Sequence, residues 1–251
     1  IIVGKFVGED ALAAVGTSNP LVTLVILFVS GLCMGAGVLI SMQYGAKDYD
    51  KLCLQLSSTL IGGLVFSAAV AIVSVIAAPA LLRIMQTDES IMDMATAYLR
   101  IILMGLIFTF IYNFFASALR AMGDSKTPLY FLMISSVFNI AGDLFFVIVL
   151  RWGSNGCALS TVISEALSCL LCVLYIEAKI PVLCLGRKWL CFEKKTFYKT
   201  VQYGWTSAMQ QATVQLGKLG IQTIVNTMGV AAMAAFAAVN RIDDFAYTPE
   251  Q

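Results

Sequence analysis

The sequence is divided into apolar stretches, each about as long as a lipid bilayer is thick, and this pattern constrains the fold more than any other feature. A transmembrane helix needs about 20 consecutive, mostly apolar residues. Hydrophobic residues make up 59% of the 251-residue chain and charged residues 12%, which is more apolar than a soluble domain at about 45–50%. The sequence therefore predicts an all-α integral membrane protein.

Charged residues, prolines and glycines predict where the spans lie. The remnant of a first span occupies residues 1–7, an eighth span begins near the end of the chain, and six complete spans lie between them, at residues 20–44, 54–78, 95–119, 129–150, 156–174 and 203–228. Pro20 opens the second span and Pro79 closes the third. Gly123 suits a helix C-cap, and Thr127 with Pro128 predicts an N-cap and first-turn proline. Residues 152–156 are typical of a turn.

The distribution of Lys and Arg predicts the orientation in the membrane, because cytoplasmic loops carry an excess of these residues. One set of alternate loops contains ten cations, and the other contains three, or four if Arg100 is added. The richer set consists of Lys47, Lys51, Arg120, Lys126, Lys179, Arg187, Lys188, Lys194, Lys195 and Lys199. We therefore expect a multi-pass membrane protein, with the linker after the sixth span in the cytoplasm.

That linker, residues 179–199, mixes cations with aromatic residues such as Trp189 and Phe197. This composition is typical of a helix lying in the headgroup region of the inner leaflet. Nucleic-acid binding is an alternative for a basic stretch, but both neighbouring segments are membrane spans, and we expect no nucleic-acid partner.

Two segments near the ends of the chain resemble each other. Residues 2–14 and 224–235 share an Ile-Val pair, a following glycine and a run of small residues. Six spans separate the two copies, so both cross the membrane in the same direction, as in parallel transporter repeats. We expect about twelve spans in all. Residues 1–180 form the first six-helix lobe with its first helix truncated, 181–202 form an amphipathic linker, and 203–251 begin a second lobe.

The fifth and sixth spans each carry polar residues at helical spacing. These are Ser135, Ser136, Asn139 and Asp143 on one span, and Thr161, Ser164, Glu165 and Ser168 on the other. Residues three and four apart share one face of a helix. A carboxylate at the centre of a bilayer costs about 2.5–3.5 kcal/mol, and such residues are usually functional.

Asn139, Asp143 and Thr161 are the candidates for a cation site. Amide, carboxylate and hydroxyl oxygens suit a hard cation such as sodium, and a desolvated Asp143 could instead exchange a proton. The alternative is that these groups form hydrogen bonds between helices, which we favour for the serines. For Glu165, function and structural pairing both stay open.

Enzyme classes are largely excluded because the chain contains no histidine, which removes Ser-His-Asp and Cys-His catalysis. Cys169 and Cys172 lie inside an apolar span without a second pair, as expected of small buried residues. Lys218 on the seventh span raises the alternative of a seven-helix retinal protein, but the three tryptophans, which would form the retinal pocket, lie near span ends. We expect no enzyme and no cofactor.

Three motifs stand out along the chain: the loop Met42-Gln43-Tyr44-Gly45-Ala46-Lys47-Asp48, the loop Leu119-Arg120-Ala121-Met122-Gly123-Asp124-Ser125-Lys126-Thr127-Pro128, and, within the spans, the Asn139-x-x-x-Asp143 pair followed by residues 158–164. Together they resemble the motifs of the multidrug and toxic compound extrusion (MATE) family, in particular its DinF-like bacterial branch. The resemblance implies a V-shaped transporter of two six-helix lobes, whose ion ligands on helices five and six correspond to Asn139, Asp143 and Thr161. A further aspartate, on helix one, would fall just before Ile1.

This chain departs from the family pattern at two places. The glutamate that the NorM-like branch carries on helix seven corresponds to Val214, and the span offers Gln210, Gln211 and Lys218 instead. Lys218 is either the partner of a carboxylate or a side chain that reaches toward the interface. An uncharged residue is expected at the position of Glu165. We keep Glu165, Gln210, Gln211 and Lys218 as candidates for the transport pathway.

The resemblance implies a sodium- or proton-coupled antiporter of a bacterial plasma membrane that exports organic cations or amphipathic drugs, and that is a monomer when complete. A lipid-linked oligosaccharide flippase of the same superfamily is the alternative. Its cavity would need several cations to bind a pyrophosphate, but only Lys218 and Arg241 lie in spans.

Overall fold

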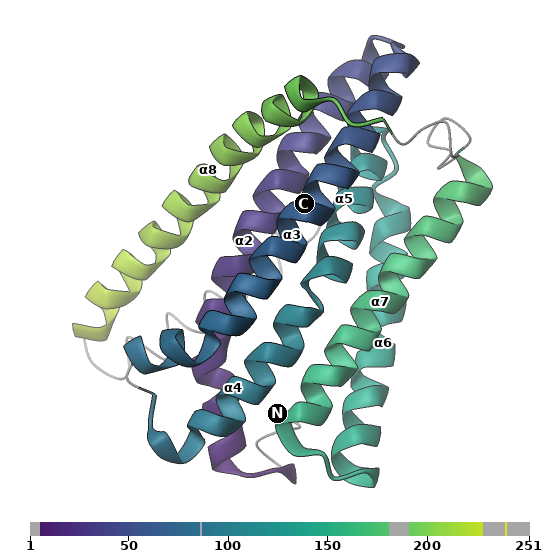
Figure 1. Ribbon diagram of the computed structural model, residues 1–251. Coiled ribbons are helices and arrows are strands. Elements are labelled where there is room, and N and C mark those ends of the chain that lie inside the picture. The colour runs from purple at the N-terminus through teal and green to yellow at the C-terminus, as the bar shows by residue number, and fades with distance from the viewer. Residues whose placement is uncertain (1–5, 86, 181–190, 228–238, 240–251) are drawn as a thin grey trace. The chain divides into compact units, whose positions relative to one another are not determined.

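The computed structural model describes the chain except for residues 1–5, 86, 181–190, 228–238 and 240–251 (Figure 1). The described elements are all helical. They are α2 (Glu9–Gly45), α3 (Tyr49–Ile84), α4 (Glu89–Met104), α5 (Leu106–Ala121), α6 (Lys126–Leu144), the π-helical turn η1 (Phe145–Val149), α7 (Gly153–Lys179) and α8 (Lys194–Thr227). The chain divides into two compact units, Ile1–Ala208 and Met209–Gln251.

Helices long and apolar enough to cross a membrane form most of the first unit. They are α2, α3, α6 continued by η1, and α7, together with α4 and α5 if that bent pair is counted as one span. This confirms the predicted class of an all-α membrane protein. The predicted seventh span falls within α8 up to Thr227, and the beginning of the eighth span, like the C-terminal copy of the repeat beyond Thr227, lies outside the described residues.

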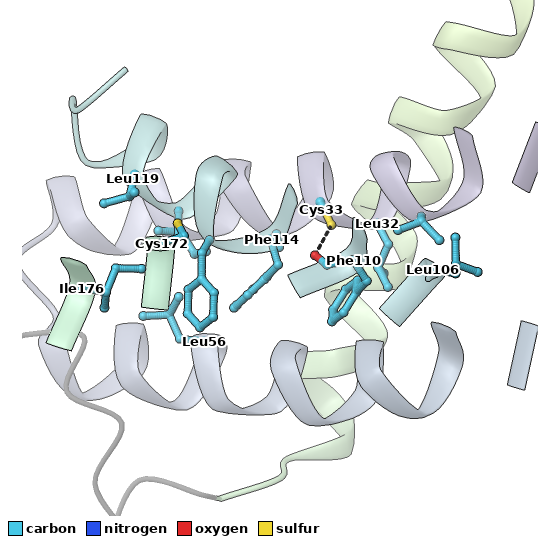
Figure 2. Close-up of a cluster of buried hydrophobic side chains, with 14 of the residues drawn as sticks. Leu32, Cys33, Leu56, Leu106, Phe110, Phe114, Leu119, Cys172 and Ile176 are labelled. Carbon is cyan, nitrogen blue, oxygen red and sulfur yellow. Dashed lines mark hydrogen bonds between the residues drawn. The ribbon is translucent and has the colours of Figure 1, made fainter. Parts of the chain in front are cut away.

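Helix α2 is at the centre of the bundle and packs against α3, α4, α5 and α7 (Figure 1). The main core lies between these helices, where Leu32, Leu56, Phe110 and Phe114 are buried. In Figure 2 the labelled side chains form a row between the helices, and the Cys33 thiol approaches the Phe110 carbonyl oxygen at 3.9 Å. In contrast, α6 packs mainly on α7 and exposes most of its apolar side chains, as expected of a helix that faces lipid.

Several of the predicted helix boundaries are wrong, three of them because of proline or turn signals. Pro20 and Pro79 lie inside α2 and α3, because a membrane helix tolerates the loss of the one backbone hydrogen bond that a proline cannot make. The predicted turn at residues 152–156 is instead the start of α7, which begins at Gly153. At these three places local turn chemistry was outweighed by the need of the backbone to pair its polar groups within the span.

The loop between α5 and α6 agrees with the sequence in one respect and differs in another. Gly123 has φ +96°, the left-handed conformation expected after a helix C-terminus. Thr127, however, is not the N-cap, because α6 already begins at Lys126. The carboxylate of Asp124 does the capping, since its Oδ1 accepts a hydrogen bond from the Thr127 amide at 3.1 Å.

The predicted span at residues 95–119 is two helices rather than one. Helices α4 and α5 meet at Gly105 with a bend of 41°. A β-carbon at Gly105 would lie 2.6 Å from Cγ2 of Val162 in α7. The absence of a side chain therefore lets α7 pack directly against the break.

A buried polar seam joins α3 to the start of α8. Gln55 Nε2 donates to Thr200 Oγ1 at 2.6 Å and to Thr59 Oγ1 at 2.9 Å. All three side chains are buried. Between Gln55 and Thr59 on α3, the hydroxyls of Ser57 and Ser58 accept hydrogen bonds from the amides of Cys191 and Glu193, each at 3.0 Å. The end of the predicted linker is thus attached to α3 through hydrogen bonds, and its last residues, from Lys194, belong to α8.

Candidate cation site between α6 and α7

The polar stripes of the fifth and sixth spans meet where α6 packs on α7. Asn139 Nδ2 donates to Thr161 Oγ1 at 3.3 Å and to Ser160 Oγ at 3.4 Å. The Ser160 hydroxyl in turn donates to the backbone carbonyl of Asn139 at 2.9 Å. Asn139 and Thr161, predicted to face each other, are therefore in direct contact. Ser160, which the sequence did not single out, is hydrogen-bonded to Asn139 as well.

Asp143 lies one helical turn beyond Asn139 on α6. Its side chain is half-buried, and its Oδ1 atom is buried without a hydrogen-bond partner among the described residues. The Ser160 hydroxyl and the Cys157 thiol lie beside the same carboxyl group. Asp143 is therefore adjacent to the Asn139 cluster through Ser160. An unpaired buried carboxylate oxygen is costly, so this atom is available to a ligand or a proton.

The close approach of the two helices depends on a glycine. A β-carbon on Gly142 would lie 2.5 Å from Ser160 Oγ. Because Gly142 has no side chain, α7 can approach α6 closely enough for Ser160 to reach Asn139 and Asp143. Two cavities flank this end of α6, one of about 290 Å³ lined by Gly142, Ser160 and aromatic rings, and one of about 420 Å³ beside η1. Asp143 lines neither.

Three of the four serines of the two stripes form hydrogen bonds described here, and one of these bonds, from Ser135, joins the two helices, which is the role favoured for the serines. Ser135 donates to the Ser164 carbonyl at 2.6 Å, and Ser164 to the Ser160 carbonyl at 2.8 Å. Ser136 donates to Leu132 of its own helix. Ser168 is buried.

Glu165 does not join the Asn139 cluster. Its Oε2 accepts a hydrogen bond from the Thr109 hydroxyl, in the first turn of α5 after the break at Gly105. Sequence reasoning missed Thr109, but a signal was present, because Thr109 and Asn113 form a polar pair at helical spacing in an apolar span, and Asn113 Nδ2 donates to the Thr109 carbonyl at 2.8 Å.

The other pathway candidates lie on α8. Gln210 is exposed and Gln211 is half-buried. The side chain of Lys218 lies outside the described residues. All three belong to the second compact unit.

At the end of the bundle that carries the α5–α6 loop, Asp124 has a fixed environment. Partial burial raises the pKa of its carboxyl, but hydrogen bonds from Thr127 and Tyr175 outweigh burial and hold the pKa below its ordinary value. Tyr175 Oη donates to Asp124 Oδ2 at 3.3 Å. The carboxylate thereby links α7 to the start of α6.

Comparison with known proteins shows which family this helical chain belongs to. The model of the MatE family matches residues 1–145 of the chain. The chain belongs to the MatE family. MatE proteins are ion-coupled membrane transporters and not enzymes, which agrees with the exclusion of catalysis on sequence grounds.

Relatives and solved structures of MatE proteins match nearly the whole chain. It is 31% identical to the probable multidrug resistance protein YoeA of Bacillus subtilis, over 98% of this chain and 55% of that protein. It is 20% identical to the multidrug export protein MepA of Staphylococcus saprophyticus, over 96% of this chain and 53% of that protein. The chain thus spans about half the length of the curated relatives it matches.

Two solved MatE structures share the fold. A crystal structure of MATE in the bent conformation aligns with a TM-score of 0.88 at 22% identity, over 99% of this chain and 56% of that chain. An outward-facing multidrug resistance MATE transporter of the MOP superfamily aligns with a TM-score of 0.88 at 23% identity, over 99% of this chain and 55% of that chain.

Proposed function

We propose that this chain is the ion-binding part of a sodium- or proton-coupled antiporter, in which ion entry drives the export of organic cations or amphipathic drugs. Membership of the MatE family and the printed names of the relatives, multidrug resistance and multidrug export proteins, support transport and the kind of cargo. The loop motifs around Gly45 and Gly123 support a place in the DinF-like branch.

The observation that carries the proposal is the buried, unpaired Oδ1 of Asp143 beside a polar cluster. A protein group of this kind is stable in lipid only with a partner. Carboxylate, hydroxyl and amide oxygens are also the groups that replace the hydration shell of a hard cation. Asp143, Asn139 and Thr161, with Ser160 between them, therefore offer the ion either a direct ligand set or, for a proton, a carboxylate to neutralise.

In the proposed cycle, the ion neutralises Asp143 and removes the cost of the buried charge. The hydrogen bonds that Asn139 and Ser160 exchange across the α6–α7 contact are the bonds that rearrange when the ion arrives or leaves. One charge that crosses a potential of 100 mV gains about 2.3 kcal/mol. That energy alone is enough for a tens-fold accumulation of a neutral cargo on the outside.

The organisation proposed for the protein rests on the sequence. Residues 1–180 form the first lobe, 181–202 the linker, and 203–251 the beginning of the second lobe. The excess of cations in alternate loops supports a cytoplasmic linker.

The test is Asp143→Asn in the complete protein, expressed in cells that lack their own drug exporters. We expect the variant to reach the membrane at the normal level and to lose ion-driven efflux of a fluorescent cationic dye. Asp93→Asn, which changes an exposed carboxylate of α4, is the matched control and should leave efflux unchanged. Undiminished efflux by Asp143→Asn would contradict the proposed site.

The same cells distinguish the two ions. A sodium gradient imposed at constant pH drives efflux if sodium is the coupling ion, whereas a pH gradient in sodium-free buffer drives it if the proton is.

A further inference from the structure

Glu165 is a second carboxylate within a membrane span, and the proposed transport site makes no use of it. It lies on α7 one turn beyond Thr161, and its Oε2 atom accepts a hydrogen bond from Thr109 of α5 rather than from the Asn139 cluster. It therefore faces the broken span formed by α4 and α5, while Asp143 faces the contact of α6 with α7.

On the two helices of the broken span, Arg100, Tyr98 and Tyr112 interact with groups other than Glu165. On α4, Arg100 Nε donates to the Val75 carbonyl at 3.3 Å, and Tyr98 interacts with Asp143 and Cys157. On α5, Tyr112 donates to the Pro128 carbonyl at 3.0 Å. Among the described residues, Thr109 is the only side chain that interacts with the Glu165 carboxyl.

The ligand that fits this environment is a proton. A hard metal cation requires several oxygen ligands, and within the described part of the chain Glu165 has one hydroxyl beside it. A carboxylate in an apolar span without a cation to balance it is costly, and binding a proton removes the charge without further ligands.

Thr109 connects the protonation state of Glu165 to the break in the span. Its Oγ1 atom contacts two acceptors, the Glu165 carboxylate and, at 3.4 Å, the carbonyl oxygen of Gly105. A hydroxyl carries one hydrogen and can donate to only one of them at a time. When Glu165 is ionised, Thr109 donates to it. When Glu165 binds a proton, its own O–H donates to Thr109 Oγ1, and the Thr109 hydrogen is released to the Gly105 carbonyl.

We propose that Glu165 is a second proton-binding site, separate from the Asn139–Asp143–Thr161 cluster, whose proton changes the hydrogen bonding of the break between α4 and α5. This inference rests on the proposed ion-coupled transport. It adds a second group that is charged in one part of the cycle and neutral in another. The bend at Gly105, against which α7 is packed through Val162, is the element that the proton acts on.

The test is pH-difference infrared spectroscopy of the complete protein in lipid, which needs no transport. Between about pH 9 and pH 6 exposed carboxylates stay ionised, so carbonyl bands of carboxylic acids that appear in this window come from carboxyls with restricted solvent access. We expect bands from Asp143 and Glu165. Glu165→Gln should remove one band and keep the band that Asp143→Asn removes. Glu177→Gln, which changes an exposed carboxylate of the same helix, should remove none.

A second pair of variants retains the carboxyl group. Thr109→Val should shift the Glu165 band, because the hydrogen bond is lost, and Thr109→Ser should leave it in place. A spectrum unchanged by Glu165→Gln, or a Glu165 band unmoved by Thr109→Val, would overturn the inference. Failure of the proposed function is a separate result, since it would appear as undiminished efflux by Asp143→Asn.

Discussion

At the scale of single residues, two features decide what the site can do: an unpaired carboxylate oxygen and a missing side chain. Asp143 Oδ1 is buried and unpartnered among the described residues, and Gly142 beside it leaves room for the Ser160 hydroxyl. The sequence singled out Asp143 as a candidate, because a carboxylate in an apolar span is conspicuous. It could not predict Ser160, because the register between two helices depends on packing that no local pattern encodes.

Gly142→Ala should therefore destabilise the site. The new methyl group would lie 2.5 Å from Ser160 Oγ, and crowding of this kind costs about 1–3 kcal/mol. We expect a lower thermal midpoint of the purified protein and weaker ion binding. Gly16→Ala is the control, since a β-carbon at Gly16 in α2 meets nothing within 4 Å. Equal midpoints for the two variants would contradict the tight contact.

Asp124→Ala should reduce stability in a manner that depends on pH. The folded-state pKa of Asp124 is held below its ordinary value, so its contribution is complete above the ordinary value and is lost as the pH falls through the folded-state pKa. We expect a loss of about 1 kcal/mol at neutral pH, the usual effect of removing a capping side chain. The difference from wild type should shrink toward about pH 3 in chemical denaturation. A difference independent of pH would show that the charge plays no part.

At the scale of helices, contacts between elements overrule local signals. The sequence predicted most of the helices, because apolar stretches in lipid must be helical. It did not predict the break at Gly105, since one glycine in an apolar span is tolerated in many straight helices. The reason for a glycine at the break appears only in the packing, because Val162 of α7 lies where a side chain at residue 105 would be.

Gly105→Ala should push α7 away from the break, and shortening Val162 should restore the fit. The β-carbon would lie 2.6 Å from Val162 Cγ2. We expect a lower thermal midpoint for Gly105→Ala and a partial recovery in Gly105→Ala/Val162→Ala, measured against Val162→Ala alone. The Ile102 carbonyl at 3.1 Å keeps the recovery incomplete. A double variant whose losses simply add would contradict the proposed contact.

The seam between α3 and α8 should show strong coupling. Gln55→Ala leaves the buried hydroxyls of Thr59 and Thr200 with fewer partners, which costs about 1–3 kcal/mol. In a double-mutant cycle with Thr200→Val we expect a coupling energy of about 0.5–3 kcal/mol from chemical denaturation. Thr200→Ser retains the hydroxyl and should cost less than Thr200→Val. A coupling energy of zero would mean that the hydrogen bond at 2.6 Å does not stabilise the attachment.

At the scale of the whole molecule, the distribution of charge predicts an orientation that can be measured. The cation-rich loops, with Cys191 among them, are predicted to face the cytoplasm. Of the six described cysteines, Cys191 is exposed, Cys53 is half-buried and the rest are buried.

The class of fold could be predicted from composition and span length, whereas the attachment of the linker to α3 depends on side chains far apart in the sequence and could not be predicted.

Thiol labelling tests this orientation. In intact cells a membrane-impermeant maleimide should leave Cys191 unmodified and should react with it after the membrane is opened. A Trp152→Cys variant, at an exposed position that is predicted to face the outside, should be labelled in intact cells. Labelling of Cys191 in the wild-type chain from outside would contradict the predicted orientation.

The π-helical turn at Phe145–Val149 separates α6 from the short connection to α7. Leu150 N bonds to the Phe145 carbonyl at 3.1 Å, five residues back, so this turn holds one residue more than an α-helical turn would. Removing a single amino acid there would leave an ordinary α-helical turn and shorten the chain by one residue between Asp143 on α6 and Thr161 on α7. The chain length between the two halves of the proposed ligand set can therefore be altered by one codon, without changing any residue that would hold the ion.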